Sequence, residues 1–533
     1  MIRRTEWACT LALTALIVFL HAYRAGTAGA LWRDEVNTLR CASLPSLLEV
    51  WSALCNSTPP FLPYSVMHTW ISWLGSGDIS LRVLGALEGI GILFALWWNA
   101  QLLRYRIPIL SLVLFGLSPT AILWQDSPRG YGLALLFLLL ACGCVWKVVE
   151  SPTPGRVALA IVACLLSTQT VFQAVPILFA IVLGGALVCL RKGMWKRTVV
   201  VLGIGAMSAL SLMPYRLIIT GYRDINLVAR IHYDFPQIGN VLATTLSSAT
   251  DYLWWAWIFW AGMGILAGGY LIARRQEDDG REERVNVSIF SLSIVVIGTL
   301  SFLVFIKRGN LQLNPWHCVP WMGSMALAVE VLIAQVTTTI PRIVGRLVLA
   351  LTVAAVAIPI AWAQVGSRGT NLDVVASVLE ERASPGDLIV ANPWFFGVTL
   401  RHYYRGETAW TTVPPLRQAG RVRYELLKDQ MARENPLQPV YDAMEKSLSS
   451  GKRVWVIGLF RTPPKGELPP FLPPAPNGPG GWYSGYYLNV WTQQLGYFLD
   501  SHVRHGERVE LPLPGPISPY ENATLWEFAG WRP

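Results

Sequence analysis

Long apolar blocks fill the first two thirds of the sequence, and they constrain the fold more than any other feature. A helix needs about 20 apolar residues to cross a hydrocarbon core, and most of these blocks reach that length. The blocks therefore predict about eleven transmembrane helices. The predicted spans are residues 6–22, 80–103, 107–124, 131–149, 156–171, 173–190, 198–218, 251–273, 286–306, 317–337 and 345–364.

Two neighbouring blocks leave this count open. Residues 156–171 and 173–190 run together through Phe172 and Gln173, so they fit two spans, one long hairpin or a re-entrant segment. One span more or fewer would reverse the side of every later loop. The orientation of the chain therefore needs an independent signal.

Basic residues in alternate loops provide that signal, because Lys and Arg accumulate in the cytoplasmic loops of membrane proteins. We interpret the first apolar block as an uncleaved helix with a cytoplasmic N-terminus. The C-terminal region then lies on the outer side of a plasma (inner) membrane. The residues that this orientation places inside are Arg3, Arg4, Arg104, Arg106, Lys147, Arg156, Arg191, Lys192, Lys196, Arg197, Arg274, Arg275, Arg281, Arg284, Arg342 and Arg346.

The composition supports a membrane protein and argues against a nucleic-acid partner. Of the 533 residues, 53% are hydrophobic and 14% are charged, whereas soluble domains carry about 25% charged residues. The net charge of +10 comes mostly from short loops between apolar blocks, where basic residues orient the chain.

The apolar blocks end near residue 364. We expect residues 1–364 to form a transmembrane domain, with a large first outer loop at 23–79, and residues 365–533 to form an outer domain. The predicted fold class is an α-helical polytopic membrane protein with a small soluble α/β domain at the C-terminus.

Several segments of the C-terminal region have clear patterns. Residues 371–379 have helical spacing, whereas 388–391 and 453–458 are typical of buried strands. Residues 494–503 resemble a helix that leads into a strand at 508–511. The stretch 461–484 is rich in Pro and Gly, which predicts a loop or crossover, and we expect this domain to shape acceptor binding.

The cysteines provide little chemistry. Of the eight, only Cys41 and Cys55 fall in the large first outer loop. They could form a disulfide in an oxidising compartment, and two unpaired thiols are an equal alternative. Metal-ligand spacing such as Cys-x-x-Cys is absent from the sequence. We therefore expect no cofactor and no metal, although a requirement for a divalent cation is an open alternative.

The most informative segment is 31–38, Leu-Trp-Arg-Asp-Glu-Val-Asn-Thr, just beyond the first apolar block. Asp34 and Glu35 are adjacent, and adjacent residues do not share a helix face, so we expect separate roles for them. An acid pair neutralised by Arg33 and Arg40 is the alternative for this segment in isolation.

Further motifs follow in order along the predicted outer side. They are Thr58-Pro59-Pro60-Phe61, then Ser80-Leu81-Arg82, then Ser118-Pro119, and then Gln125-Asp126-Ser127-Pro128-Arg129-Gly130-Tyr131. This ordered set resembles the GT-C glycosyltransferases of the protein mannosyltransferase-like superfamily, which includes the aminoarabinose transferases and the rhizobial lipopolysaccharide core transferases. The chain departs from that pattern at Thr58, where the family usually has His, and at Asp126, where it usually has Glu.

The resemblance implies transfer of a sugar from a polyprenyl phosphate to an acceptor hydroxyl at the outer membrane surface. A hydroxyl nucleophile needs a general base, and the resemblance implies Asp34 for this role, with Glu35 beside it in the catalytic pair. The phosphate leaving group needs cations to stabilise its developing charge. The substrate-binding residues that we expect are Arg82, Asp126, Arg129, Tyr131, Lys307 and Arg308.

Other basic residues, Arg33, Arg223 and Arg230, also lie on the predicted outer side against the general trend. Structural ion pairs are the alternative for two candidates, Arg129 with Asp126 and Arg82 with Glu88, and solvated loop charges for Lys307 and Arg308. Glu88 and Glu330 fall inside apolar spans, so we expect them to face the protein interior.

Two other function classes remain open. A transporter or flippase of lipid-linked sugars would also need many spans, although such proteins tend to contain internal repeats, and we find none between the halves. A non-catalytic membrane scaffold is the second alternative. The sequence does not identify the sugar or the acceptor, which could be a glycolipid, a polysaccharide or a protein.

Overall fold

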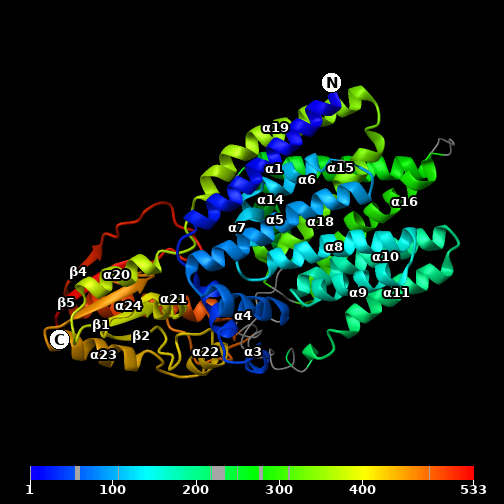
Figure 1. Cartoon of the computed structure of the whole chain (residues 1–533). Helices are drawn as coiled ribbons and strands as arrows, with labels where there is room; N and C mark the ends of the chain where they lie inside the picture. Colours follow the sequence, from blue (N-terminus) through cyan, green and yellow to red (C-terminus); the bar gives the residue numbers. More distant parts are fainter. Residues whose placement is uncertain are drawn as a thin grey trace. The chain divides into compact units, whose positions relative to one another are not determined.

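The computed structural model describes residues 2–54, 60–105, 107–216, 218, 234–248, 250–274, 280–309, 312–478 and 481–533. The chain divides into two compact units, and each is described here by itself (Figure 1). The helical unit contains the described residues of 1–27, 59–216 and 232–366. The α/β unit contains residues 28–54 together with the described residues of 367–533.

The described part of the helical unit is built from helices. Its elements are α1 (Ile2–Thr27), α4 (Leu62–Leu74), α5 (Asp78–Leu102), α6 (Ile109–Ser111), η2 (Leu112–Gly116), α7 (Pro119–Gln125), α8 (Tyr131–Glu150), α9 (Pro154–Thr168), η3 (Phe172–Ala174), α10 (Val175–Arg191), α11 (Trp195–Leu210), α14 (Phe235–Ser247), α15 (Asp251–Ala273), α16 (Arg281–Leu292), η4 (Ser293–Ile297), α17 (Gly298–Gly309), η5 (Pro315–Cys318), α18 (Val319–Val336) and α19 (Ile340–Val365).

Within the described residues, eight helical segments are long and apolar enough to cross a membrane. Each corresponds to one predicted span, which confirms a multi-pass membrane protein. The eight are Ile2–Thr27, Asp78–Leu102, Tyr131–Glu150, Phe172–Arg191, Asp251–Ala273, Arg281–Gly309, Pro315–Val336 and Ile340–Val365. The other three predicted spans correspond to shorter helices, so the count of eleven stays a prediction.

The predicted span 107–124 is divided into three short helical pieces, α6, η2 and α7. A new helix begins at Pro119, because Ser118 caps it by accepting the N–H of Ala121 at 3.4 Å. Proline at the first helical position lacks only an N–H that would be unsatisfied there anyway. The Ser-Pro motif therefore starts the short helix that leads into the segment 125–131.

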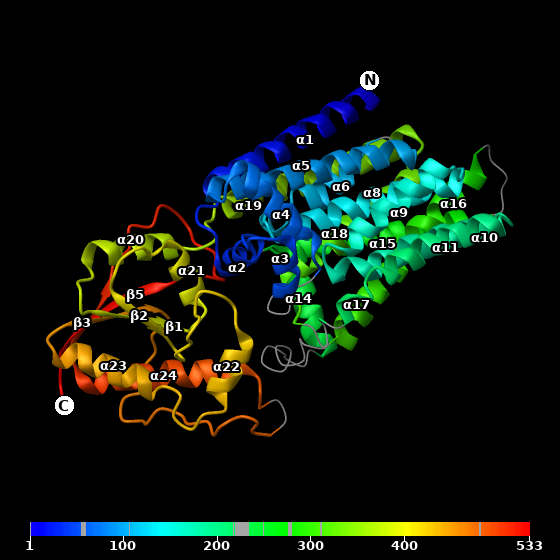
Figure 2. The same ribbon diagram turned by 60° about the horizontal axis from the view of Figure 1, so that its bottom comes forward.

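The ambiguous region 156–190 contains two separate helices, α9 and α10, which are connected through η3. The helix α9 packs against α8 and α11, and α10 packs against the same two helices. Figure 2 shows these four helices side by side. The region therefore forms two helices, and the number of spans that they make stays a prediction.

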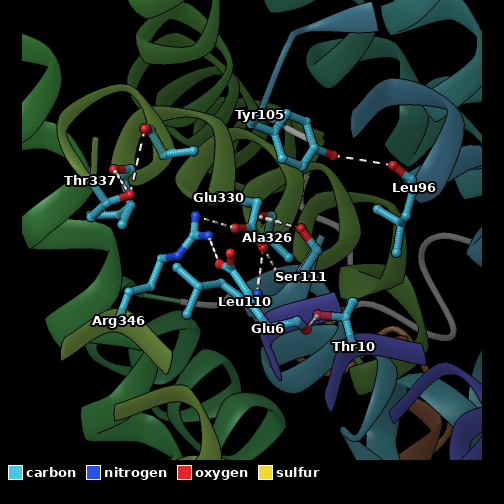
Figure 3. Close-up of polar contacts among 12 residues, drawn as sticks. Glu6, Thr10, Leu96, Tyr105, Leu110, Ser111, Ala326, Glu330, Thr337 and Arg346 are labelled. Atoms are coloured by element: carbon cyan, nitrogen blue, oxygen red, sulfur yellow. Dashed lines mark hydrogen bonds and ion pairs between the residues drawn. The ribbon is translucent and has the colours of Figure 1, made fainter. Parts of the chain in front are cut away.

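Intramembrane carboxylates face the protein interior, as expected. Glu88 is 4% exposed and Glu330 is fully buried. Figure 3 shows the surroundings of Glu330, which accepts the N–H of Ser111 at 2.9 Å and lies 3.4 Å from the guanidinium of Arg346. Arg346 also pairs with Glu6. This network joins α1, α18 and α19 in the core of the helical unit.

The α/β unit contains a mixed five-stranded sheet with the strand order β2-β1-β3-β5-β4. The strands β2, β1 and β3 are parallel, and β5 pairs antiparallel with β3 and β4. The helices α20 and α21 cover one face and α23 and α24 the other (Figure 2). The elements are α2 (Arg33–Ala42), α3 (Leu47–Ala53), α20 (Leu372–Arg382), β1 (Leu388–Asn392), α21 (Phe396–Tyr403), β2 (Ala409–Thr412), α22 (Tyr424–Met431), α23 (Gln438–Ser449), β3 (Arg453–Gly458), α24 (Ser484–His502), β4 (Val503–Val509) and β5 (Thr524–Trp531).

The predicted small α/β domain is confirmed, with differences at its edges. The predicted helix 371–379 is α20, and the strands 388–391 and 453–458 are β1 and β3. The strand predicted at 508–511 begins earlier, at Val503, and ends at Val509. The strands β2 and β5 were not predicted.

Residues 28–54 pack within the α/β unit, although the sequence places them in the first loop of the transmembrane domain. The helix α2 packs against α21, and the N–H of Leu31 donates to the Tyr403 hydroxyl at 2.6 Å. The division of the chain at residue 364 into two functional domains stays a prediction.

Candidate functional site

Asp34 lies in the first turn of α2, where its carboxylate is 22% exposed. The Nε of Arg33 donates to Asp34 Oδ1 at 3.0 Å. Glu35 points elsewhere, because its buried carboxylate accepts the N–H of Trp32 at 3.2 Å and so caps the start of the helix. The two adjacent acids therefore have different surroundings, as the sequence predicted.

Arg33 is fixed from several directions. Its guanidinium lies 4.6 Å from the ring centroid of Phe395, and its backbone N–H donates to Glu521 Oε2 at 2.9 Å. The other carboxylate oxygen of Glu521 accepts the hydroxyl of Thr399 at 2.9 Å. Burial raises the pKa of Glu521 to about 7, although the positive charge of Arg33 acts to lower it. Residues far apart in the sequence thus hold the start of the helix that carries Asp34.

Asp126 of the helical unit is paired with a residue that the sequence analysis did not consider. Its Oδ2 lies 2.8 Å from Nδ1 of His21 in α1, and both side chains are buried. Burial raises the pKa of Asp126, and the positive charges of His21, Arg24 and Arg82 partly offset this rise. Arg82, a predicted ligand, is buried. The ion-pair partner of Asp126 is therefore His21 and not Arg129, which was the alternative.

Glycines allow α5 to approach this segment closely. A side chain at Gly85 would collide with the backbone carbonyl of Asp126, and one at Gly89 would collide with His21. Glu88, on the same helix, accepts the N–H of Leu133 at 3.0 Å. The predicted alternative pairing of Glu88 with Arg82 is therefore replaced by a backbone contact.

Arg129 lies among aromatic rings. Its guanidinium is 5.4 Å from the ring centroid of Tyr131 and 5.8 Å from that of Trp316. Trp316 packs against Trp124 at 4.6 Å and donates its indole N–H to His317 at 3.0 Å. We call this set, Trp124, Arg129, Tyr131, Trp316 and His317, the arginine–aromatic cluster.

Lys307 and Arg308 lie in the last turn of α17. The Nζ of Lys307 is 5.6 Å from the ring centroid of Phe235, and Arg308 is exposed. Cations in the last turn stabilise the helix dipole, so this position also has a structural explanation.

The predicted site residues therefore fall into two groups. Asp34 and Glu35 belong to the α/β unit, and the other six belong to the helical unit. Within the helical unit the structure brings Arg129 to Tyr131. The residues Cys55, Thr58, Arg223 and Arg230 lie outside the described residues, and so does the predicted disulfide.

The sequence analysis missed His21 and Glu521. A polar residue inside a predicted span is a functional signal in its own right, and His21 could have been found that way. Glu521 lies in the loop between β4 and β5, and no sequence motif marks it. Among the described residues, no group of three or more His, Cys, Asp and Glu side chains is arranged to hold a metal ion.

No protein-family model and no curated protein matches the sequence. Among solved structures, the chain is similar to ArnT from Cupriavidus metallidurans in the apo state, with a TM-score of 0.50, 13% identity and coverage of 85% of this chain and 93% of that chain. ArnT from the same organism bound to undecaprenyl phosphate matches with a TM-score of 0.46 and 13% identity, over 85% of this chain and 93% of that chain. The Archaeoglobus fulgidus oligosaccharyltransferase in complex with Zn and sulfate matches with a TM-score of 0.47 and 11% identity, over 83% of this chain and 67% of that chain. The match to apo ArnT shows that the chain has the GT-C fold.

Proposed function

We propose that the protein is a membrane glycosyltransferase that moves a sugar from a polyprenyl-phosphate donor to an acceptor hydroxyl at the outer face of the membrane. The observation that carries this proposal is the environment of Asp34. Its carboxylate is partly exposed and is held by Arg33 at the start of α2. It occupies the position that the resemblance to GT-C enzymes assigns to the base, in a chain with that fold.

Asp34 acts as the general base in this proposal. It removes the proton from the acceptor hydroxyl while that oxygen forms a bond to the anomeric carbon of the donor sugar. The bond between the anomeric carbon and the phosphate oxygen breaks, and the polyprenyl phosphate leaves with the electron pair. Glu35 supports this step by fixing the first turn of α2 through its hydrogen bond with Trp32.

Cationic residues stabilise the phosphate. Arg129 is the leading candidate, because an arginine stacked on aromatic rings keeps its planar donors oriented for phosphate oxygens. Arg82, Lys307 and Arg308 are assigned as further ligands from their positions in the sequence. Asp126 and Tyr131 order this region through His21 and Arg129.

The same proposal includes the topology. The N-terminus lies in the cytoplasm, the protein resides in the plasma (inner) membrane, and residues 365–533 form a domain on the outer side. Alternate basic loops support this orientation. The acceptor is a glycolipid, a polysaccharide or a protein of the cell envelope.

Purified protein in lipid nanodiscs tests the proposal with a panel of radiolabelled polyprenyl-phosphate sugars. We expect one donor to be hydrolysed slowly or transferred, and Asp34→Asn to abolish this turnover while donor binding persists. Asp429→Asn, at an exposed position of the same unit, is the matched control. Equal transbilayer movement of the donor by wild type and Asp34→Asn, without sugar release, would replace the transferase with a flippase.

A further inference from the structure

Two arginines of the α/β unit, Arg40 and Arg401, lie against Gly420, which directly precedes a third, Arg421. Arg40, in the last turn of α2, donates to the backbone carbonyl of Gly420. A Cβ added at Gly420 would collide with the guanidinium of Arg40 and would lie 3.0 Å from Cγ of Arg401, so both side chains pass this point of the backbone. The positive charges of Arg401, Arg405 and Arg421 all act on Arg40.

Among the described residues of the unit, none of the four guanidinium groups forms an ion pair with a carboxylate. The nearest acid in the hydrogen-bond pattern is Glu380, which accepts the backbone N–H of Arg405. Burial and the three neighbouring arginines lower the pKa of Arg40 to about 10.

Helix dipoles explain only part of this arrangement. Arg40 and Arg401 lie in the last turns of α2 and α21, where a cation is stabilised by the negative end of the helix. Arg405 and Arg421 lie outside those turns. The dipoles therefore account for two of the four charges.

We propose that Arg40, Arg401, Arg405 and Arg421 form a binding site for a multiply charged oxyanion of the phosphate class. Guanidinium groups present planar pairs of donors that match phosphate oxygens. Four positive charges favour a ligand with a charge of two or more over a single carboxylate. The proposal does not depend on the transfer reaction, because it concerns binding alone.

The position of this site relates it to Asp34. Arg40 follows Asp34 by six residues on α2, which corresponds to about 9 Å along a helix axis. The anion is either free phosphate or diphosphate, or the phosphate of a lipid headgroup. Both sources share the same chemistry.

Isothermal titration of inorganic pyrophosphate into the full-length protein in a neutral detergent tests the site. We expect binding that weakens at high ionic strength, and a loss of about tenfold or more in Arg401→Gln and Arg421→Gln. Arg433→Gln, at an exposed position of the same unit, should bind as wild type does. Binding that is equal in all of these proteins, or undetectable in wild type, would overturn the proposal.

Thermal unfolding separates a ligand site from a structural cluster. Pyrophosphate should raise the Tm of wild type, because a ligand that binds only the folded state stabilises it. Without the anion, Arg421→Gln should unfold no earlier than wild type, since it removes a like charge without removing a helix-dipole contact. A lower Tm for Arg421→Gln together with no effect of pyrophosphate on wild type would show a structural cluster instead.

Nanodiscs distinguish the two sources of the anion. If a lipid headgroup fills the site, wild type in nanodiscs that contain phosphatidate should bind added pyrophosphate more weakly than in nanodiscs of phosphatidylcholine. Equal affinity in both identifies a soluble anion. Either result supports the site, provided that Arg401→Gln removes the binding.

Discussion

The carboxylate of Glu521 accepts the backbone N–H of Arg33 at 2.9 Å, although the two residues are 488 positions apart in the chain. Arg33 is the first residue of α2, so the contact fixes the start of the helix that carries Asp34. The orientation of the proposed base therefore depends on a residue near the C-terminus.

Replacing Glu521 with Gln should change the pH dependence of stability. The pKa of Glu521 is about 7 in the folded protein and about 4.3 in an unfolded chain. The folded state thus binds more protons between these values, and the free energy of unfolding falls as the pH rises through this window. Glu521→Gln should remove up to about 4 kcal/mol of this dependence.

Tryptophan fluorescence during thermal unfolding, from about pH 4 to pH 9, measures this effect as the difference between wild type and Glu521→Gln. Glu434→Gln, at an exposed position of the same unit, serves as the control. A difference between the two proteins that is constant over the whole range would contradict the pKa of Glu521.

Asp34 and Glu35 should respond differently to loss of their charge. Asp34→Asn should lower turnover by about 10²- to 10⁴-fold, as loss of a general base does, with little change in Tm. Glu35→Gln should lower the stability by about 1 kcal/mol through the weakened cap. Transfer assays and thermal unfolding of both variants test the division of roles, and the reverse pattern would refute it.

Removal of His21 should destabilise the helical unit. His21→Leu leaves the carboxylate of Asp126 buried without its partner at 2.8 Å, and breaking a buried pair costs about 3–5 kcal/mol. The double variant His21→Leu/Asp126→Leu should be less destabilised than His21→Leu alone. A double-mutant cycle of unfolding in detergent measures the coupling energy between the two side chains. Purely additive effects would show that His21 and Asp126 do not stabilise each other.

Arg346 should matter more than its neighbour Arg342 in the same helix. Arg346→Met leaves the buried carboxylates of Glu6 and Glu330 without their shared cation (Figure 3), which predicts a loss of about 3–5 kcal/mol. Arg342 is exposed, so Arg342→Met should change stability by less than about 0.5 kcal/mol. Equal losses in the two variants would argue against the network.

Arg129→Lys should weaken donor binding although it keeps the positive charge. The guanidinium stacks on Tyr131 and Trp316, and a lysine cannot reproduce its planar geometry. Loss of the cation–π contact predicts about 2- to 30-fold weaker binding of polyprenyl phosphate. Arg342→Lys, at an exposed position of the same unit, should have no such effect, and equal binding constants in all three proteins would remove Arg129 from the site.

Hydropathy predicted the membrane helices well, because each span must satisfy its backbone internally over a fixed thickness. The break at Ser118-Pro119 was visible only as a motif. The strand β2 has four residues, which is too short for a clear alternating pattern, and β5 contains Glu527 and Gly530, which weaken the signal of a strand.

The grouping of residues 28–54 with the C-terminal region could not be predicted. It depends on contacts such as those of Leu31 with Tyr403 and Arg33 with Glu521, and local patterns carry no information about such distant pairs. The candidate residues were identified by motif, whereas their actual partners, such as His21 for Asp126, depend on how helices approach one another.

The membership of residues 28–54 in the α/β unit also bears on biosynthesis. The ribosome releases α2 among the first segments of the chain, but the partners of α2 at Tyr403 and Glu521 are translated several hundred residues later. A product that stops after α19 would contain the described membrane-spanning helices and still lack every one of these partners. The α2 segment therefore acquires its native surroundings only after residue 521 has been translated, so truncated chains inserted in the membrane would carry Asp34 without its native support.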